Sequence, residues 1–254
     1  MTVSDKLIRA KEDYDAVYDK GYSDGAAQGG GGYDQGFAEG KQAEYDAFWD
    51  AYQENGNKTN YSLAFAGKGW TAENLKPKYD IKPVILYMMF YANEMEIDLV
   101  EWFEKLGVTL DFSHPVYSAQ YVFSGSKFTR VGKVDLSIYS GKTNDVFSNM
   151  PNLHTIDELV LNEKISPYIE MFTNCTALEN IRITGTISAN IDIHWSPLTK
   201  ESIVSVVNAL SATASGQTAT FSKTAVNNAF EGGSTGSEWQ ALIATKPNWT
   251  ISLV

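Results

Sequence analysis

Phenylalanine recurs along this chain at nearly regular intervals, and that recurrence limits the possible folds more than any other feature. Five of these residues are separated by 25, 33, 24 and 25 positions: Phe65, Phe90, Phe123, Phe147 and Phe172. A unit of this size cannot bury its own apolar face. Neighbouring copies must therefore stack and cover one another, which predicts a repeat solenoid.

The apolar residues that follow the later phenylalanines repeat as well. After Phe147 come Leu153, Ile156, Leu159 and Leu161, and the neighbouring units follow a similar spacing. An apolar pair three residues apart, followed by alternation, is typical of a turn that leads into a half-buried strand. Each unit is therefore expected to contribute one strand.

The long interval of 33 residues contains a segment with a helical pattern, residues 98–106. Asp98 can cap its first turn, Glu101 stands three residues later as in a capping box, and Gly107 can close it. We interpret this segment as a short helix inserted between Phe90 and Phe123, because its removal restores the common period.

Two units carry a family resemblance. Residues 145–153, Asp-Val-Phe-Ser-Asn-Met-Pro-Asn-Leu, and residues 170–178, Glu-Met-Phe-Thr-Asn-Cys-Thr-Ala-Leu, resemble the BspA-like, or Treponema-type, leucine-rich repeats. In that family a Phe and a following Asn-Cys-x-x-Leu mark each turn of the coil. The resemblance covers roughly residues 61–197, which implies a leucine-rich-repeat solenoid there. The first three units depart from the pattern, with Gly67-Lys68, Asn93-Glu94 and Gly125-Ser126 in place of Asn-Cys.

The last segment, residues 198–254, breaks the period. It reads as an amphipathic helix over 198–210 with Thr199 as its cap, a strand over 218–222, a helix over 238–244 and a strand over 249–253. Atypical terminal units cover the open end of a repeat array. We therefore predict an α/β capping unit, which follows about five repeats over residues 57–197.

The first segment, residues 1–56, is predicted to form a helical stalk. Apolar residues there alternate by threes and fours, as in a helix that packs against another helix. Glycines continue the same spacing, and a helix that tolerates them needs close contact between backbones to recover the loss. The residues expected to mediate self-association, with a trimer as first guess, are Leu7, Tyr14, Val17, Gly21, Gly25, Gly36 and Gly40. Residues 29–32, four consecutive glycines, leave open a flexible break between two helices instead.

Net charge and composition exclude some functions. The net charge of −11 argues against nucleic-acid binding, which needs clustered Lys and Arg. The longest apolar run, residues 83–92, is shorter than the ~20 residues that span a bilayer. The single cysteine, Cys175, permits no internal disulfide, and no apolar signal segment follows Met1. We expect a chain outside the membrane and without a secretion signal.

No residue set in the sequence predicts catalysis, a cofactor or a metal. His114, His154 and His194 are 40 residues apart, which is out of step with the repeat, so they should not form a ligand set. Cys175 is expected to be a buried structural thiol. Asp157 and Glu158 are adjacent, so on a regular strand they would point to opposite faces and could not act together.

A large binding surface on the outward faces of successive strands is the remaining possibility. Its candidate residues are Asp135, Ser137, Val160, Asn162, Arg182 and Thr184. The arrangement of stalk, short repeats and cap is similar to proteins of phages that infect gut Firmicutes. That resemblance implies a non-enzymatic virion or tail protein, assembled in the host cytoplasm, whose expected partners are other virion proteins and a host-surface protein or glycan. Alternatives are a bacterial surface adhesin and, less favoured, a cell-wall glycan hydrolase, which would need two convergent carboxylates.

Overall fold

The structure, a computed structural model, describes residues 66–67, 81, 89–111, 119–137, 145–164 and 170–254. All of these belong to one compact unit, Thr59–Trp70 with Tyr79–Val254. The predicted stalk, its association residues (Leu7, Tyr14, Val17, Gly21, Gly25, Gly36 and Gly40) and the first repeat phenylalanine, Phe65, lie outside the described residues.

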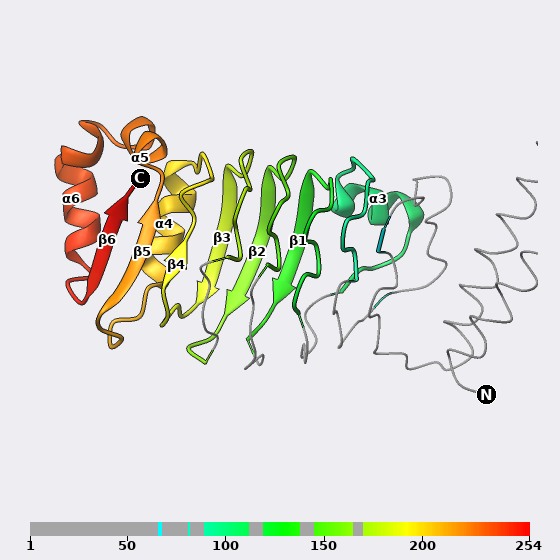
Figure 1. Cartoon of the computed structure of the whole chain (residues 1–254), viewed down its shortest axis with the longest axis horizontal. Helices are drawn as coiled ribbons and strands as arrows, with labels where there is room; N and C mark the ends of the chain where they lie inside the picture. The colour runs from blue at the N-terminus through cyan, green and yellow to red at the C-terminus, as the bar shows by residue number, and fades with distance from the viewer. Residues whose placement is uncertain (1–65, 68–80, 82–88, 112–118, 138–144, 165–169) are drawn as a thin grey trace, which may run out of the picture. The chain divides into compact units, whose positions relative to one another are not determined.

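The leucine-rich-repeat solenoid expected over residues 57–197 is wrong. Over its described part the chain is an α/β mixture of four α-helices and two separate three-stranded parallel sheets, without a solenoid (Figure 1). The first sheet has the order β1-β2-β3, with β1 at Arg130–Asp135, β2 at Thr155–Leu161 and β3 at Asn180–Gly185. The second has the order β4-β5-β6, with β4 at Ile191–Asp192, β5 at Gln217–Phe221 and β6 at Trp249–Leu253.

The first sheet stops at β3 because a helix occupies the place of a fourth strand. Helix α4 (Lys200–Ala209) is capped by Thr199, as the sequence predicted. The hydroxyl of Ser202 accepts the Ile181 N–H at 2.9 Å, and the hydroxyl of Ser205 accepts the Ile183 N–H at 2.8 Å. Both hydroxyls also donate to backbone carbonyls of the β3 segment. Covering an edge strand in this way prevents it from pairing further.

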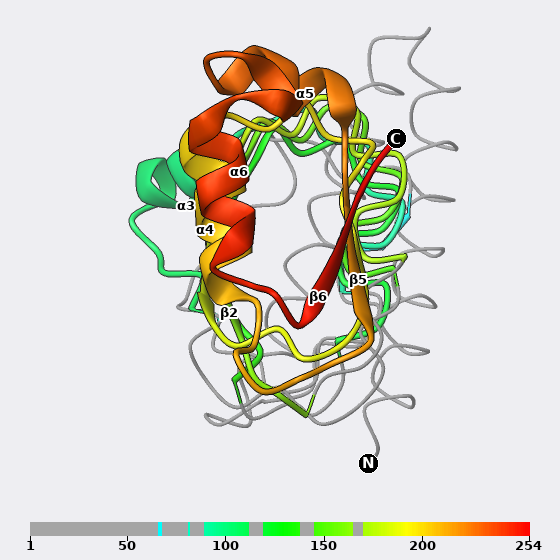
Figure 2. The same cartoon turned by 90° about the vertical axis from the view of Figure 1, so that its left-hand side faces the viewer.

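Gly185 ends β3 and turns the chain away from the sheet. Its φ of +86° lies in the left-handed region, and a Cβ there would lie 2.0 Å from the Leu161 carbonyl oxygen. The chain then enters β4, which pairs with β5 and β6. Figure 2 shows β5 and β6 on the opposite side of this unit from β2, α3 and α4. The second sheet therefore includes residues from both sides of the predicted boundary between 197 and 198.

The inserted helix predicted at 98–106 is present as α3 (Leu99–Leu106). Asp98 caps it by accepting the Glu101 N–H at 2.9 Å, and Gly107 closes it with φ +67°. Its buried residues, Leu99, Trp102 and Phe103, face the core. Gly132 of β1 lets this helix approach the strand, because a Cβ there would lie 3.2 Å from a methyl group of Val100.

The recurrent phenylalanines form a row of stacked rings in the core beside the first sheet. Phe90, Phe123, Phe147 and Phe172 are fully buried, with centroid distances of 5.6, 5.4 and 5.8 Å and interplanar angles of 7° or less. Each offset-stacked pair contributes about 0.5–1.5 kcal/mol beyond its apolar burial.

Backbone hydrogen bonds join the same turns. The N–H groups of Phe90, Phe123 and Phe147 each donate to a carbonyl of the next turn, at 2.7–3.1 Å. The residue two positions after each phenylalanine has a positive φ and donates in the same way: Ala92, Gly125 and Asn149. Gly and Asn tolerate this left-handed conformation, whereas for alanine it costs about 1–2 kcal/mol. Asn149 and Asn174 therefore suit these positions because the backbone there is left-handed.

Three helices and a cluster of aromatic side chains cover the second sheet. Helices α4 and α6 (Ser237–Ala244) and the strands β5 and β6 were predicted within one or two residues. Helix α5 (Lys223–Ala229) and the short 3-10 helix at Gly233–Thr235 were not predicted. Trp239, almost fully buried, packs against Phe221 and Phe230 with centroid distances of 6.0 and 5.4 Å.

Candidate functional site

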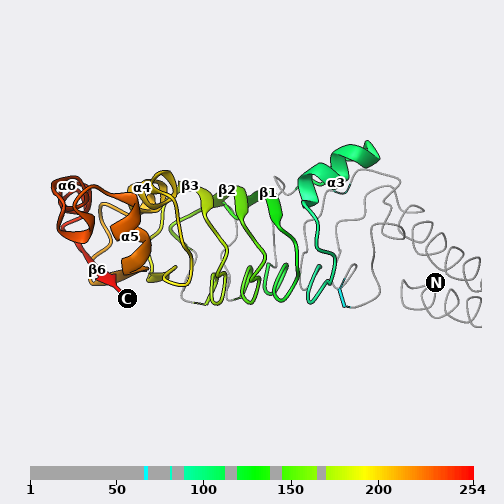
Figure 3. The same cartoon turned by 90° about the horizontal axis from the view of Figure 1, so that it is seen from above.

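The exposed face of the first sheet lies between α3, next to β1, and α4, next to β3. Figure 3 shows the three strands side by side with α3 beyond β1 and α4 beyond β3. The bridge between Asp98 and Arg130 joins the α3 segment to β1, and the serine bonds described above join α4 to β3. We call this surface, floored by β1–β3 and walled by α3 and α4, the trough.

An irregularity in β2 places two carboxylates on the floor of the trough. The register between β2 and β3 shifts between Ile156 and Leu159, so β2 has one residue more than β3 opposite it. Ile156 and Leu159 are buried, while Asp157 and Glu158 between them are both half-buried. The expectation that these two side chains point to opposite faces is wrong, because a β-bulge interrupts the alternation.

Arg130 holds the first of these carboxylates. Its Nε and Nη2 donate to Asp157 at 2.8 and 3.0 Å, and its Nη1 lies 3.5 Å from the Asp98 carboxylate. Bidentate pairs of this kind fix both partners more firmly than single contacts do. The Arg130 guanidinium therefore links Asp98, the N-cap of α3, to Asp157 in the middle of the floor.

Glu158 is the centre of a second network. It pairs with Lys133 of β1 at 3.2 Å and with Arg182 of β3 at 3.1 Å, and it accepts the Thr184 hydroxyl at 3.0 Å. Partial burial by itself would raise the pKa of Glu158. The hydrogen bonds from Lys133 and Thr184 and the charges of Lys133 and Arg182 outweigh that effect, so its pKa lies below the ordinary 4.5.

These pairings decide what the two carboxylates can do chemically. A glycoside hydrolase acid must keep its proton near neutral pH, which requires a raised pKa. Glu158 is shifted in the opposite direction, and Asp157 is held by a bidentate arginine. The pair is therefore built for positioning and charge complementarity, and it lacks the arrangement of an acid and a free nucleophile.

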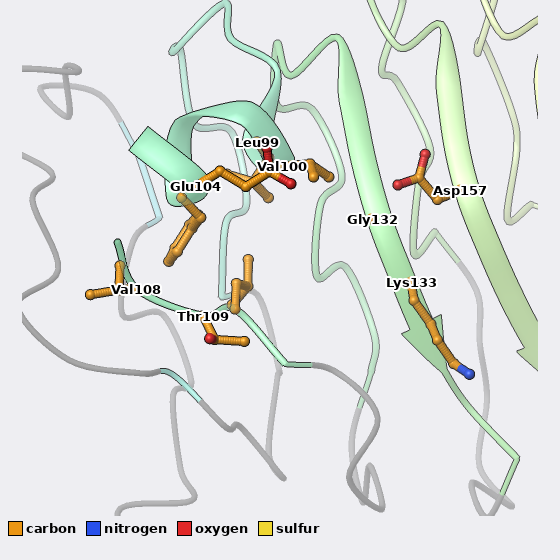
Figure 4. Close-up of a pocket in the computed structure, with 10 residues that line it drawn as sticks. Leu99, Val100, Glu104, Val108, Thr109, Gly132, Lys133 and Asp157 are labelled. Carbon is orange, nitrogen blue, oxygen red and sulfur yellow. The ribbon is translucent and has the colours of Figure 1, made fainter. Parts of the chain in front are cut away.

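Two hollows open into the trough, one at each wall. The first lies between α3, the segment 108–110 and β1, has a volume of about 280 Å³, and is lined mainly by apolar side chains (Figure 4). The second lies between β2, β3 and α4, has a volume of about 520 Å³, and is lined by many polar residues together with the apolar atoms of Ile156, Ile181 and Val204. Asp157 lines both hollows, so it stands between them.

The predicted surface residues occupy the floor and its far end. Asp135, Val160 and Thr184 are direct neighbours across the three strands, and Arg182 belongs to the Glu158 network. At the end of the strands the roles are structural. Asp135 accepts the Ser137 N–H at 2.8 Å, and the Asn162 amide donates to the carbonyls of Leu136 and Ser137.

Sequence reasoning missed several residues of the trough, Arg130, Lys133, Asn180 and Glu201, and it considered Asp157 and Glu158 but set them aside. The signal for the bulge was available, because the step from Ile156 to Leu159 is three residues in a strand that otherwise alternates. The two walls had no such signal, because α3 and α4 reach the sheet through tertiary packing.

Other candidates for chemistry remain isolated. Residues 232–236 match the G-x-S-x-G pattern of serine hydrolases, but Ser234 lies in a 3-10 helix between α5 and α6. That pattern requires a sharp strand-to-helix turn. His194 pairs with Asp192 at 2.5 Å, and His154 is exposed. Within the described ranges no group of His, Cys, Asp and Glu could hold a metal ion.

Cys175 is fully buried, as predicted, and its thiol donates to the Phe147 carbonyl oxygen at 3.0 Å. Among the helices that the structure describes, none is long and apolar enough to cross a membrane. Comparisons with models of protein families, with curated proteins and with solved structures gave no match to this chain.

Proposed function

We propose that this chain is a non-enzymatic binding protein that uses the trough to attach to a large partner. The observation that carries the proposal is the trough itself: a polar floor three strands wide, held in place by ion pairs, between two helices that each bound a hollow. Arg130 and Glu158 link neighbouring strands through their side chains, so the surface is rigid before any partner arrives. Such preorganisation reduces the entropy cost of binding.

The context of this binding rests on the similarity of the sequence arrangement (residues 1–56, the short repeat units and the last segment) to proteins of phages that infect gut Firmicutes. We propose that the partner lies on the surface of a Firmicutes cell and that the chain is part of a phage virion, in which it contacts other virion proteins. Self-association through residues 1–56, as a trimer, would multiply weak contacts into firm attachment.

Attachment through the trough can be tested by binding of the fluorescently labelled full chain to intact cells of a panel of gut Firmicutes. The double variant Asn180→Trp/Arg182→Ala fills the hollow at α4 and removes a floor cation. We expect it to bind at least tenfold more weakly than the unaltered chain. Thr176→Trp, at an exposed position outside the residues that line the trough, is the matched control and should bind normally.

Equal binding of the double variant and the control would refute attachment through the trough. A fall in the turbidity of the cell suspension would instead favour wall hydrolysis. Self-association is tested separately by light scattering of the full chain and of the variant Leu7→Asp/Val17→Asp. A trimeric mass that becomes monomeric in the variant supports the proposal, and a monomeric unaltered chain contradicts it.

A further inference from the structure

The hollow at α3 has the size and lining of a pocket for one apolar side chain. Leu99, Val100, Phe103, Val108 and Leu110 contribute to its wall. Its volume of about 280 Å³ lies below the usual range of pockets for whole small molecules, ~300–1,000 Å³. An aliphatic or aromatic side chain would bury its surface favourably against these apolar groups.

The hollow at α4 has more hydrogen-bonding side chains in its lining than the hollow at α3. Its lining includes Asn180 and Arg182 of β3 and Glu201 and Asn208 of α4. Side-chain amides, a guanidinium and a carboxylate can satisfy the backbone and the polar side chains of an extended peptide. A partner segment lying across the strands could therefore place an apolar group in the α3 hollow and find hydrogen-bonding groups at the α4 wall.

The charges along the trough favour a cationic partner. The floor cations Arg130, Lys133 and Arg182 are all engaged by carboxylates of the protein itself. Each wall adds an exposed glutamate, Glu104 of α3 and Glu201 of α4, and neither forms an ion pair with any residue that the structure describes. The walls therefore carry uncompensated negative charge, which attracts Lys or Arg on a partner.

The span between the walls sets the length of the partner segment. Neighbouring strands are ~4.8 Å apart, so three strands with one further interval on each side cover ~20 Å. An extended chain advances ~3.3 Å per residue, and about six residues would cross the trough.

We infer that the trough binds an extended polypeptide segment of a partner protein, about six residues long, with an apolar side chain in the α3 hollow and basic side chains beside Glu104 and Glu201. This inference rests on the proposed function and specifies the partner as a protein segment. Hydrophobic anchoring gives affinity, while the two glutamates select for charge and orientation.

The test is an array of random dodecapeptides probed with the labelled full chain, with an array of bacterial glycans probed in parallel. We expect the bound peptides to be enriched in Lys or Arg within six residues of Leu, Ile or Phe. The strongest of these peptides is then titrated against Glu104→Gln/Glu201→Gln, Val108→Ser and the matched control Glu163→Gln. Glu163 is exposed and lies outside both hollows.

The inference predicts binding at least fivefold weaker for the double glutamate variant, about threefold weaker for Val108→Ser, and unchanged for Glu163→Gln. Unchanged melting temperatures show that the variants fold. Peptides without the basic and apolar pattern, no bound peptide, or equal binding by the double variant would overturn it. Glycan binding with trough-dependent cell attachment would overturn the polypeptide inference while leaving the proposed function intact.

Discussion

The two parallel sheets of this protein differ in how their successive strands are connected. Parallel strands need a crossover from the end of one strand to the start of the next. In the second sheet the crossovers between β4, β5 and β6 contain the helices α4, α5 and α6. In the first sheet the described parts of the crossovers contain turns and no helix, and these turns pair with one another through buried phenylalanines and backbone hydrogen bonds. The described turns of the first sheet are therefore ordered by neighbouring turns of the same kind, whereas the crossovers of the second sheet are ordered by helices.

This difference predicts how stability is distributed. Each turn in the first region packs against the turns before and after it. A substitution in one turn should therefore destabilise the neighbouring turns and strands as well. The second region depends on one cluster around Trp239. Five substitutions test this comparison, in order of expected effect.

Phe147→Ala removes a ring that stacks on two others, Phe123 and Phe172. Truncating a buried phenylalanine costs about 3–5 kcal/mol of unfolding free energy. We expect amide hydrogen exchange to accelerate in β1–β3 and to change little in β5 and β6. Phe221→Ala should show the reverse. Acceleration spread equally over both sheets by either variant would mean that the two regions unfold as one unit.

Gly185→Ala tests the turn that separates the two sheets. The added Cβ meets the Leu161 carbonyl oxygen at 2.0 Å, and the backbone conformation is left-handed as well. We expect a loss of about 3 kcal/mol or more, measured by urea denaturation. Gly216→Ala is the matched control, since its φ is +75° and the added Cβ meets no atom within 4 Å. Its loss should be about 1 kcal/mol, and equal losses at both positions would contradict the steric explanation.

Ser202→Ala tests whether α4 replaces a fourth strand. The variant leaves the Ile181 N–H and the Glu179 carbonyl without the hydroxyl that pairs with both. An unsatisfied buried group costs about 1–3 kcal/mol, so we expect a loss of about 2 kcal/mol in thermal or urea unfolding. Ser215→Ala, at an exposed position before β5, should be nearly neutral. A neutral Ser202→Ala would show that helix packing alone protects the edge of β3.

Glu158→Gln tests the charge network on the floor of the trough. At neutral pH the variant should lose about 1 kcal/mol, as the carboxylate pairs with Lys133 and Arg182. Because the folded-state pKa of Glu158 lies below 4.5, its contribution is present above that pH and disappears as the pH falls through the folded-state value. Urea denaturation of both proteins between pH 7 and pH 3 should show the difference shrinking in acid. A difference that grows in acid would contradict this assignment.

Ala92→Gly should stabilise the protein slightly. Ala92 has a φ of +52° at the position where the neighbouring turns have Gly125, Asn149 and Asn174. Relief of this strain should give a gain of about 1 kcal/mol, reduced by the greater freedom of glycine in the unfolded chain. Ala177→Gly, at an alanine without a positive φ, should be destabilising. A loss at Ala92 would mean that its methyl group contributes more through packing than the strain costs.

Local features were predictable from the sequence because local chemistry produces them. The cap at Asp98, the stop at Gly107, the cap at Thr199 and the strand ending at Leu253 each follow from a few neighbouring residues. The spacing of the phenylalanines correctly indicated that equivalent residues in different turns meet.

The architecture was not predictable in the same way. Periodicity indicates which residues are equivalent, but it does not say where the hydrogen-bonded ladder ends. The ladder ends partly because of Gly185, where any side chain would collide with the Leu161 carbonyl of the neighbouring strand. It also ends because the serines of α4 bond the edge of β3, and they reach that edge only after the fold has formed. The trough was partly missed for a related reason. Its walls are helices brought to the sheet by tertiary packing, and its carboxylates share a face only through the bulge in β2.

The buried thiol beneath the phenylalanine row has a practical consequence. Burial raises the pKa of Cys175 to about 12, so the reactive thiolate is scarce at physiological pH. Cys175 is also the only cysteine in the chain. Two cysteines introduced on the two walls of the trough would therefore be the only thiols that a maleimide spin label or cross-linker can readily reach. The native protein is already suited to distance measurements by electron paramagnetic resonance, without first replacing a residue of its core.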